Sequence, residues 1–152
     1  MLLSRSSVNR AKVNATGGPY HTALQAAVVT HLRGRDMINK EQNKTIKHLL
    51  TRGADAGMIG GRFYNALHAA VLSDRHNSVI RILFKYELSE PGLNVNMRDA
   101  EGRTALLLAA ARGNYRTYRL LLKLGADESL VDTQARGLIH MAVMGSETGY
   151  HT

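Results

Sequence analysis

Apolar residues along the chain fall into short blocks that come in pairs. The first block of a pair is a seven-residue segment rich in alanine and leucine, and such segments occupy 22–28, 65–71, 104–110 and, in a weaker copy, 137–143. A second block, rich in isoleucine and leucine, follows three of them, at 46–50, 79–83 and 118–122. Apolar groups at helical spacing in both blocks predict pairs of packed helices.

Turn-forming residues separate the blocks, most clearly in the third pair. Asp99–Gly102 predicts a β-turn before the first helix, and the hydroxyl of Thr104 is placed to cap that helix. Gly113–Asn114 predicts a reversal between the two helices, and Gly125 predicts a left-handed end to the second. A helix, a tight turn and a second helix therefore form one unit.

The same unit recurs along the chain. Residues 22–28 read Thr-Ala-Leu-Gln-Ala-Ala-Val, residues 65–71 read Asn-Ala-Leu-His-Ala-Ala-Val, and Gly-Ala-Asp closes two pairs, at 53–55 and 125–127. The distance from Thr104 to Gly137 is 33 residues, which is typical of a repeat of two stacked helices. The pattern resembles the ankyrin repeat family, whose signature is T-P-L-H-x-A followed by L-L-x-x-G-A-D. This resemblance implies an all-α solenoid of stacked helix-turn-helix units.

The resemblance extends over most of the chain and sets the expected domain organisation. We expect one ankyrin repeat domain over 17–146, with about three full repeats and a partial C-terminal one; their bounds are 17–59, 60–98, 99–131 and 132–146. Residues 1–16 are expected to be disordered or the remnant of a preceding repeat, and 147–152 a flexible tail. The Gly-Gly turns at 17–18 and 60–61 resemble those of large fungal ankyrin proteins. Both ends resemble incomplete repeats, so we expect a fragment of a longer array, a shortened gene product, or a protein whose ends are covered by a partner.

Two repeats are longer than the third, and the surplus is expected outside the stacked core. From Thr22 to Asn65 is 43 residues, ten more than 33, and the surplus around 31–44 predicts a surface loop or a helix extension. From Asn65 to Thr104 is 39 residues, six more than 33, and the surplus falls at 87–92.

Composition agrees with stacked helices and excludes several classes of site. Hydrophobic residues make up 44% of the 152 but aromatic ones only 5%, so small aliphatic side chains must form the core. The sequence has no cysteine, which excludes disulfides and thiolate metal sites. No apolar run approaches the roughly 18 residues that span a bilayer. An intracellular location, cytoplasmic or nuclear, with no membrane partner, is therefore expected.

The residues offer little catalytic or metal-binding chemistry. His68 and His140 occupy the histidine position of the family signature, which implies a hydrogen-bonding role at the repeat junction. The sequence Ser73-Asp74-Arg-His76 has no oxyanion hole or nucleophile elbow around its serine. We therefore predict no catalytic, cofactor-binding or metal-binding residue, and no enzyme.

The family resemblance implies a non-catalytic protein-binding module. Partners of such solenoids commonly lie on a concave surface built from inner helices and turn tips. The candidate residues at those positions include tyrosine and arginine, which are enriched at interface hot spots. They are Tyr20, His21, Arg62, Phe63, Tyr64, Ser73, Glu101, Arg103, Arg112 and Arg136.

The net charge of +8 keeps a second class of partner open. We predict another protein, with an acidic or extended segment, as the partner. Nucleic acid or another polyanion, bound by the same arginines, is the alternative, although the 20 lysines and arginines form no block. Arg116, Arg119 and Lys123 share one helix face, interpreted as solvent-facing, with an acidic-partner patch as the minority alternative. A third alternative is that the chain is part of a larger multidomain signalling or receptor protein and has no independent role. The sequence predicts no oligomeric state.

Overall fold

The chain consists of α-helices joined by turns. The computed structural model describes residues 12–29, 37–73, 77–87 and 93–148, and these contain seven helices and no strand. The predicted all-α fold is thus confirmed for the described part of the chain. It divides into two compact units, Met1–Leu93 and Asn94–Thr152.

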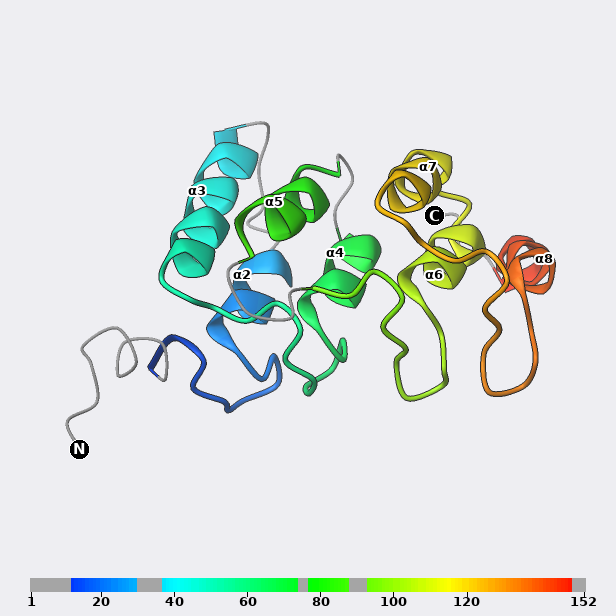
Figure 1. Ribbon diagram of the computed structural model, residues 1–152, viewed down its shortest axis with the longest axis horizontal. Coiled ribbons are helices and arrows are strands. Elements are labelled where there is room, and N and C mark those ends of the chain that lie inside the picture. The colour runs from blue at the N-terminus through cyan, green and yellow to red at the C-terminus, as the bar shows by residue number, and fades with distance from the viewer. Residues whose placement is uncertain (1–11, 30–36, 74–76, 88–92, 149–152) are drawn as a thin grey trace. The chain divides into compact units, whose positions relative to one another are not determined.

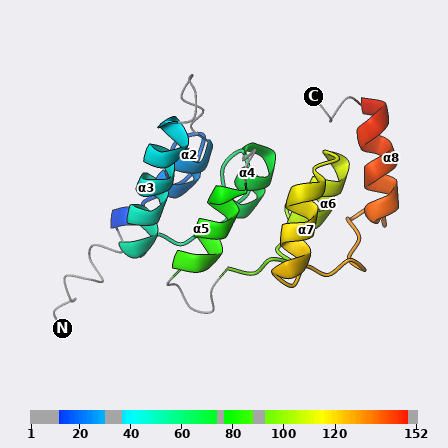
Figure 2. The ribbon, with the colours of Figure 1, turned by 90° about the horizontal axis from the view of Figure 1, so that it is seen from above.

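The N-terminal unit contains two helix pairs. The first is α2 (Ala23–Val29) with α3 (Met37–Thr51), and the second is α4 (Ala66–Ser73) with α5 (Ser78–Tyr86). Helix α2 packs against α3 and α4, and α5 packs against α3 and α4. The outer helices α3 and α5 lie side by side over the inner helices α2 and α4 (Figures 1 and 2). Each pair thus buries its apolar face against the next pair.

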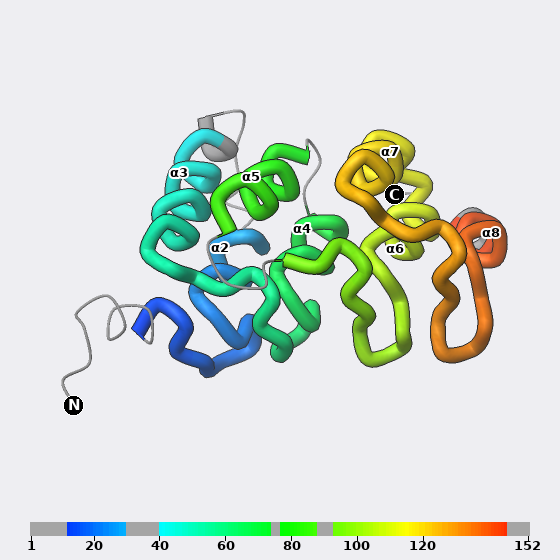
Figure 3. Tube along the Cα trace, in the orientation of Figure 1, coloured from blue at the N-terminus to red at the C-terminus, as the bar shows by residue number. Residues whose placement is uncertain are grey.

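The C-terminal unit contains a third pair and one further helix. These are α6 (Ala105–Ala111), α7 (Tyr115–Lys123) and α8 (Leu138–Thr148). Helix α6 packs against both α7 and α8. The chain forms long hairpin-shaped turns before α6 and α8, and these two turns lie side by side (Figure 3). At their tips the backbone N–H of Thr133 donates to the carbonyl of Glu101 at 3.0 Å.

The helix ends of the third repeat follow the sequence prediction. The Thr104 hydroxyl oxygen accepts a hydrogen bond from the Leu107 N–H at 3.2 Å, and the Asn114 side chain caps α7 by accepting from the Thr117 N–H at 3.1 Å. Gly113 and Gly125 have positive φ values of 65° and 94°. The cap, the reversal and the left-handed helix end are therefore confirmed.

Aliphatic side chains form both cores, as the low aromatic content predicted. The largest fully buried aliphatic side chains in the N-terminal unit are Leu24, Val28, Ile46, Leu50, Leu67, Ile80 and Leu83. Those in the C-terminal unit are Leu106, Leu107 and Leu121. Helices that bury mainly leucine, isoleucine and alanine approach one another closely without large rings between them.

The surplus segments lie partly outside the described residues. Helix α3 begins at Met37, so the predicted extension around 31–44 is helical from there, while 31–36 are outside the described part. Residues 88–92, Asp74 and His76 also lie outside the described part, as do 1–11, where disorder was expected, and 149–152 of the expected tail.

One turn residue links consecutive repeats in each unit. The Asn14 side chain donates to the carbonyl of Gly53 at 2.9 Å and accepts from the N–H of Asp55 at 2.8 Å. Asn96 accepts in the same way from the N–H of Asp127 at 2.9 Å. Both asparagines thus fix the Gly-Ala-Asp segment of the repeat that follows.

Helix α8 departs from the sequence prediction at its C-terminal end. The partial fourth repeat was expected to end at residue 146, but α8 continues to Thr148. Gly145 lies so close to α6 that a Cβ there would be 2.7 Å from the carbonyl carbon of Ala111. A glycine at this point permits the close approach of two helix backbones. Around it Leu107, Ala111 and Met141 form a small buried cluster.

The two signature histidines have different environments. His68 is buried, and its Nδ1 lies 2.9 Å from Oδ1 of Asn65, so it has the predicted structural role. His140 is exposed, and the same expectation is wrong for it. In the described part of the C-terminal unit no helix covers that side of α8.

Candidate protein-binding surface

The predicted partner-binding residues fall into three groups in the structure. Five belong to the turn tips of the N-terminal unit, namely Tyr20, His21, Arg62, Phe63 and Tyr64. Three belong to the turns of the C-terminal unit, namely Glu101, Arg103 and Arg136. The remaining two, Ser73 and Arg112, lie at the C-terminal ends of the inner helices α4 and α6.

The turn tips of the N-terminal unit carry a stacked pair of aromatic rings. Tyr20 and Phe63 are parallel to within 2°, with ring centroids 6.5 Å apart. The backbone N–H of Arg62 donates to the carbonyl of Pro19 at 3.1 Å, which fixes one tip against the other. The guanidinium of Arg62 lies 5.8 Å from the centroid of the Phe63 ring. Because Tyr20 is 38% exposed, these groups present an accessible aromatic surface with a cation beside it.

At both tips the backbone adopts a left-handed conformation, which residues other than glycine rarely adopt. His21 and Tyr64 have φ values of 67° and 74°, which cost about 1–2 kcal/mol each for a residue with a side chain. The His21 ring lies over Gly60, where a Cβ would come within 2.6 Å of it. Tyr64 meets the edge of His68 at 5.9 Å. Packing therefore holds both strained residues in place.

The arginines of the C-terminal unit are held inside their own turns. The Asp99 carboxylate accepts from the backbone N–H of Glu101 and Arg103 at 3.0 and 2.8 Å, and from Nε of Arg103 at 2.8 Å. A second carboxylate, that of Glu101, accepts from the Arg103 guanidinium at 3.1 Å. Arg103 thus stabilises the turn, and its charge is compensated where it lies.

The next turn repeats this arrangement one repeat later. The Asp132 carboxylate accepts from the backbone N–H of Gln134 and Arg136, each at 2.9 Å, and from Nε of Arg136 at 2.6 Å. The four-residue spacing of aspartate and arginine in both turns, at 99–103 and 132–136, is visible in the sequence. It is the signal by which these ion pairs could have been predicted, and sequence reasoning missed it.

Asp132 is a buried carboxylate whose pKa is lowered. Its side chain is fully buried, and burial by itself raises its pKa. Hydrogen bonds from the backbone and guanidinium of Arg136 and from the N–H of Gln134, with the positive charge of Arg136, outweigh burial and bring the pKa below its ordinary value. The folded state therefore favours the ionised form.

A pH dependence of stability follows from this lowered pKa. Above the unfolded pKa of about 3.9, ionised Asp132 stabilises the folded chain, and this contribution is lost as the pH falls through the lower folded pKa. We expect Asp132→Asn to lower the free energy of unfolding by about 1–2 kcal/mol at pH 7 and by clearly less near pH 3. Urea unfolding of both proteins at the two pH values measures this.

The control for that experiment is Glu41→Gln. Glu41 forms an ion pair with Lys44 in which both side chains are more than 70% exposed, so the substitution should change stability little at either pH. An equal loss for Asp132→Asn at pH 7 and pH 3 would contradict the role given to the ionised carboxylate.

The two helix-end residues are both half-buried. The Ser73 hydroxyl lies 2.6 Å from the carbonyl of Ala69 and 3.3 Å from that of Val28, so it is used in contacts within the N-terminal unit. Arg112 is half-buried, and its backbone N–H ends α6 by donating to Leu108 at 3.0 Å. Of the ten predicted residues, the structure therefore gathers the five turn-tip residues most clearly into one surface.

The described residues contain no group of three or more histidines, aspartates and glutamates arranged to hold a metal ion. Among the helices of the described ranges, none combines the length and the apolar character that a membrane-spanning segment needs.

Comparison with known proteins decides the family. A family model described as ankyrin repeats (three copies) matches residues 35–132, which is more than half of the chain. The chain belongs to the ankyrin repeat family. The stacked helix pairs, the capping Thr104 and the Gly-Ala-Asp helix ends are those of its repeats, so the fold predicted from the sequence is confirmed.

Relatives of this ankyrin repeat chain include very different proteins. A probable palmitoyltransferase AKR2 of Saccharomyces uvarum is 34% identical over 59% of the chain, and the transient receptor potential cation channel subfamily A member 1 of Drosophila melanogaster is 38% identical over 51%. Human Rabankyrin-5 is 30% identical over 68% of the chain. The matches cover only 12%, 6% and 9% of these three relatives.

What these relatives share with the chain is the repeat itself. Ankyrin repeats are non-catalytic and generally act as protein–protein interaction modules. Because the relatives come from yeast, fruit fly and human, the fungal character expected from the Gly-Gly turns stays a prediction.

Proposed function

We propose that this chain is a non-catalytic protein-binding module that holds an extended segment of a partner protein on the turn tips of its N-terminal unit. The observation that carries the proposal is the stacked pair of Tyr20 and Phe63 with Arg62 beside it. Aromatic residues and arginine dominate interface hot spots, and here they meet on one small surface. Protein binding is also the general role of the family.

The geometry of the tips supports binding at low entropic cost. The hydrogen bond between Arg62 and Pro19 and the packing of His21 over Gly60 fix the backbone before a partner arrives. Binding to a surface that is already ordered avoids the cost of ordering it. The ring faces suit apolar or proline side chains of a partner, and the Arg62 guanidinium suits a carboxylate.

Charge compensation favours a protein partner over nucleic acid. Arg103 and Arg136, two of the arginines predicted to attract a polyanion, are paired with Asp99 and Asp132. A paired arginine contributes little to the release of counterions that drives binding to phosphates. Tight, steeply salt-dependent binding to an arbitrary DNA duplex would favour the polyanion alternative instead.

The relatives support a module inside a larger protein. Since the matching region is 12% or less of the three relatives named above, we propose that a chain of this kind contributes binding rather than chemistry to whatever it belongs to. The biological role of the chain would then depend on which partner protein it binds.

The test is a double variant, Tyr20→Ala with Arg62→Glu, compared with wild type by affinity purification and mass spectrometry. A partner found with wild type should then bind the purified variant about 30-fold more weakly, because loss of a hot spot costs about 2 kcal/mol. Calorimetry with the purified partner gives both dissociation constants.

The matched control for the test lies on the outer helices of the same unit. The double variant Tyr86→Ala with Lys44→Glu also combines a tyrosine truncation with a reversal of a positive charge, on α5 and α3, and it should bind like wild type. Equal binding by the turn-tip variant and the control would refute the proposed surface.

A further inference from the structure

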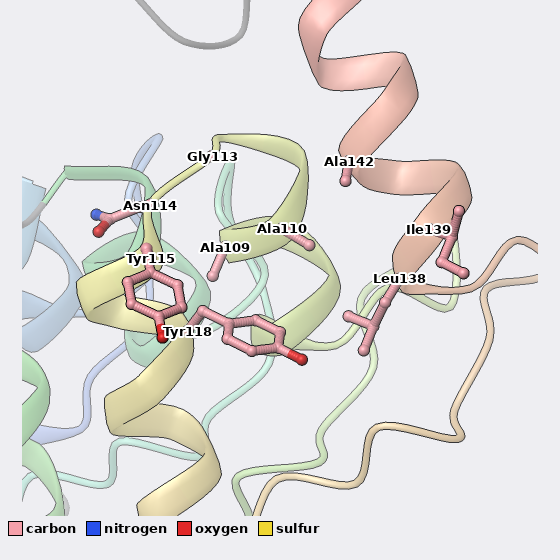
Figure 4. A pocket seen from close by; sticks show the side chains of 9 residues that line it. All are labelled: Ala109, Ala110, Gly113, Asn114, Tyr115, Tyr118, Leu138, Ile139 and Ala142. Atoms are coloured by element: carbon pink, nitrogen blue, oxygen red, sulfur yellow. The ribbon is translucent and has the colours of Figure 1, made fainter.

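The C-terminal unit has an open apolar groove between α7 and α8, with α6 as its floor. The groove has a volume of about 340 Å³. In Figure 4 the side chains of Tyr115 and Tyr118 line the α7 side, and those of Leu138 and Ile139 line the α8 side. Tyr115 is 67% exposed and Ile139 is 81% exposed, so large apolar surfaces face solvent here.

The N-terminal unit shows which kind of element fits such a groove. Its inner helix α2 packs against α3 and α4, as α6 packs against α7 and α8. In the N-terminal unit, however, a further helix, α5, packs against both α3 and α4. The described part of the C-terminal unit has no helix in that position.

Matching positions make the comparison quantitative. Gly53 and Gly125, and likewise Asn65 and Gly137, are 72 residues apart, so this spacing relates α3 to α7 and α4 to α8. The groove residues and their counterparts are Tyr118 with Ile46, Ile139 with Leu67, and Ala142 with Ala70. All three counterparts are 0% exposed, whereas Tyr118 is half-buried and Ile139 and Ala142 are exposed. The groove on α7 and α8 therefore corresponds to the surface of α3 and α4 that α5 covers in the N-terminal unit.

The described course of α8 differs from that of the inner helix of the third repeat. There the inner helix ends at Ala111, and Gly113–Asn114 reverse the chain into α7. The residues 33 positions later are Ser146–Glu147, and the backbone is still helical there, up to Thr148. Because α8 makes no such reversal within the described residues, the occupant that we consider is a helix of a separate polypeptide.

The surroundings of the groove define the charge of its occupant. Lys47 of α3 lies 4.8 Å from the ring centroid of Tyr86 in α5. The position 72 residues later is Arg119, which lies 5.7 Å from the ring of Tyr115 at the rim of the groove. With Arg116 and Lys123, it gives the exposed side of α7 three positive charges. Glu128, which accepts a hydrogen bond from the Tyr118 hydroxyl at 2.6 Å, adds one negative charge, so the positive charges remain in excess. Carboxylates on the occupant would complement them.

We propose that this groove binds an amphipathic helix of a partner protein, with an acidic flank next to Arg119. Its apolar face would resemble that of α5, in which Val79, Ile80 and Leu83 are buried. A helix laid into an apolar groove through such anchors is a recurrent mode of protein recognition. The site is separate from the turn tips, so it stands or falls independently of the proposed function.

The probe is a labelled peptide with the sequence of α5 and its flanking residues. It comprises residues 77–87, with Arg81→Glu linked by a lactam to Lys85, and Glu87 keeps its negative charge. Both linked positions are exposed in the structure, so the link leaves the apolar face unchanged. The lactam is needed because a helix this short is marginal in water. Fluorescence anisotropy measures its binding to the full chain.

We expect the peptide to bind the wild-type chain and to bind Ile139→Glu at least tenfold more weakly. Ile139 is 81% exposed, so the substitution should leave the fold unchanged, which circular dichroism checks. The matched control is Ile59→Glu, since Ile59 is 53% exposed and lies in the other unit. A peptide with serine at positions 79, 80 and 83 should not bind.

Three results would overturn the proposal. The first is no binding by a peptide that circular dichroism shows to be helical. The second is binding that Ile139→Glu leaves unchanged. The third is a dimer of the wild-type chain in sedimentation equilibrium that Ile139→Glu dissociates, because the groove would then belong to a second copy.

Discussion

Replacing Gly145 by leucine should separate α8 from α6 and destabilise the C-terminal unit by about 3 kcal/mol, at the upper end of the usual cost of overpacking. A Cβ at this position would lie 2.7 Å from the carbonyl carbon of Ala111, and backbone cannot give way as a flexible side chain can. The cluster of Leu107, Ala111 and Met141 would open with it. Urea unfolding and hydrogen exchange of the α8 amides measure the effect.

Gly17→Ala is the matched control for Gly145→Leu. A Cβ at Gly17 would meet nothing within 4 Å, so the change in stability should stay within about 0.5 kcal/mol. If Gly145→Leu leaves the protection of α8 at the wild-type level, the close approach of α6 and α8 is wrong.

Leu83→Ala should cost about 3 kcal/mol of the stability of the N-terminal unit. Leu83 is 0% exposed and lies on α5, which packs against both α3 and α4. Truncation of a buried leucine loses its transfer free energy and leaves a cavity that the helices close only in part. The free energy of unfolding in urea, compared with wild type, gives the cost.

An exposed residue of the same unit provides the comparison for Leu83. Ile59 is 53% exposed, and Ile59→Ala should change stability by less than about 0.5 kcal/mol. A loss below 1 kcal/mol for Leu83→Ala would mean that α5 is not held by its apolar face. The comparison of α5 with the occupant of the groove in the C-terminal unit would then lose its basis.

The helix pairs could be predicted from the sequence because the same local signals occur in each repeat. An apolar spacing, a capping residue such as Thr104 and a glycine such as Gly125 act within a few residues of one another. Local signals of this kind do not depend on where the neighbouring repeat lies. The cores of both units follow from them.

The arrangement of the candidate surface could not be predicted in the same way. Tyr20 and Phe63 are 43 residues apart, and their stacking depends on the register between two turns, which no local pattern encodes. The end of α8 depends on how closely Gly145 approaches α6. The pairing of Arg103 with Asp99, in contrast, could have been predicted, because both residues lie in one turn and their four-residue spacing is visible in the sequence.

The geometry of the turns also explains why basic residues were hard to assign from the sequence alone. Arg136 looked like a surface cation, but its guanidinium is bonded to the buried Asp132 and only 25% of its side chain is exposed. Arg62 looked the same in the sequence and is exposed beside an aromatic ring. An arginine that pairs with a carboxylate of its own turn is less able to bind a partner than one that is exposed, such as Arg62.

Photo-crosslinking from the turn tips tests the proposed recognition surface most directly. Benzoylphenylalanine replaces Tyr20 in one protein and Tyr86, on the outer helix α5, in another. We predict that the partner is captured from position 20, that unlabelled wild-type chain competes for it, and that position 86 captures none. Capture from position 86 but not from position 20 would contradict the turn tips as the surface that this protein uses.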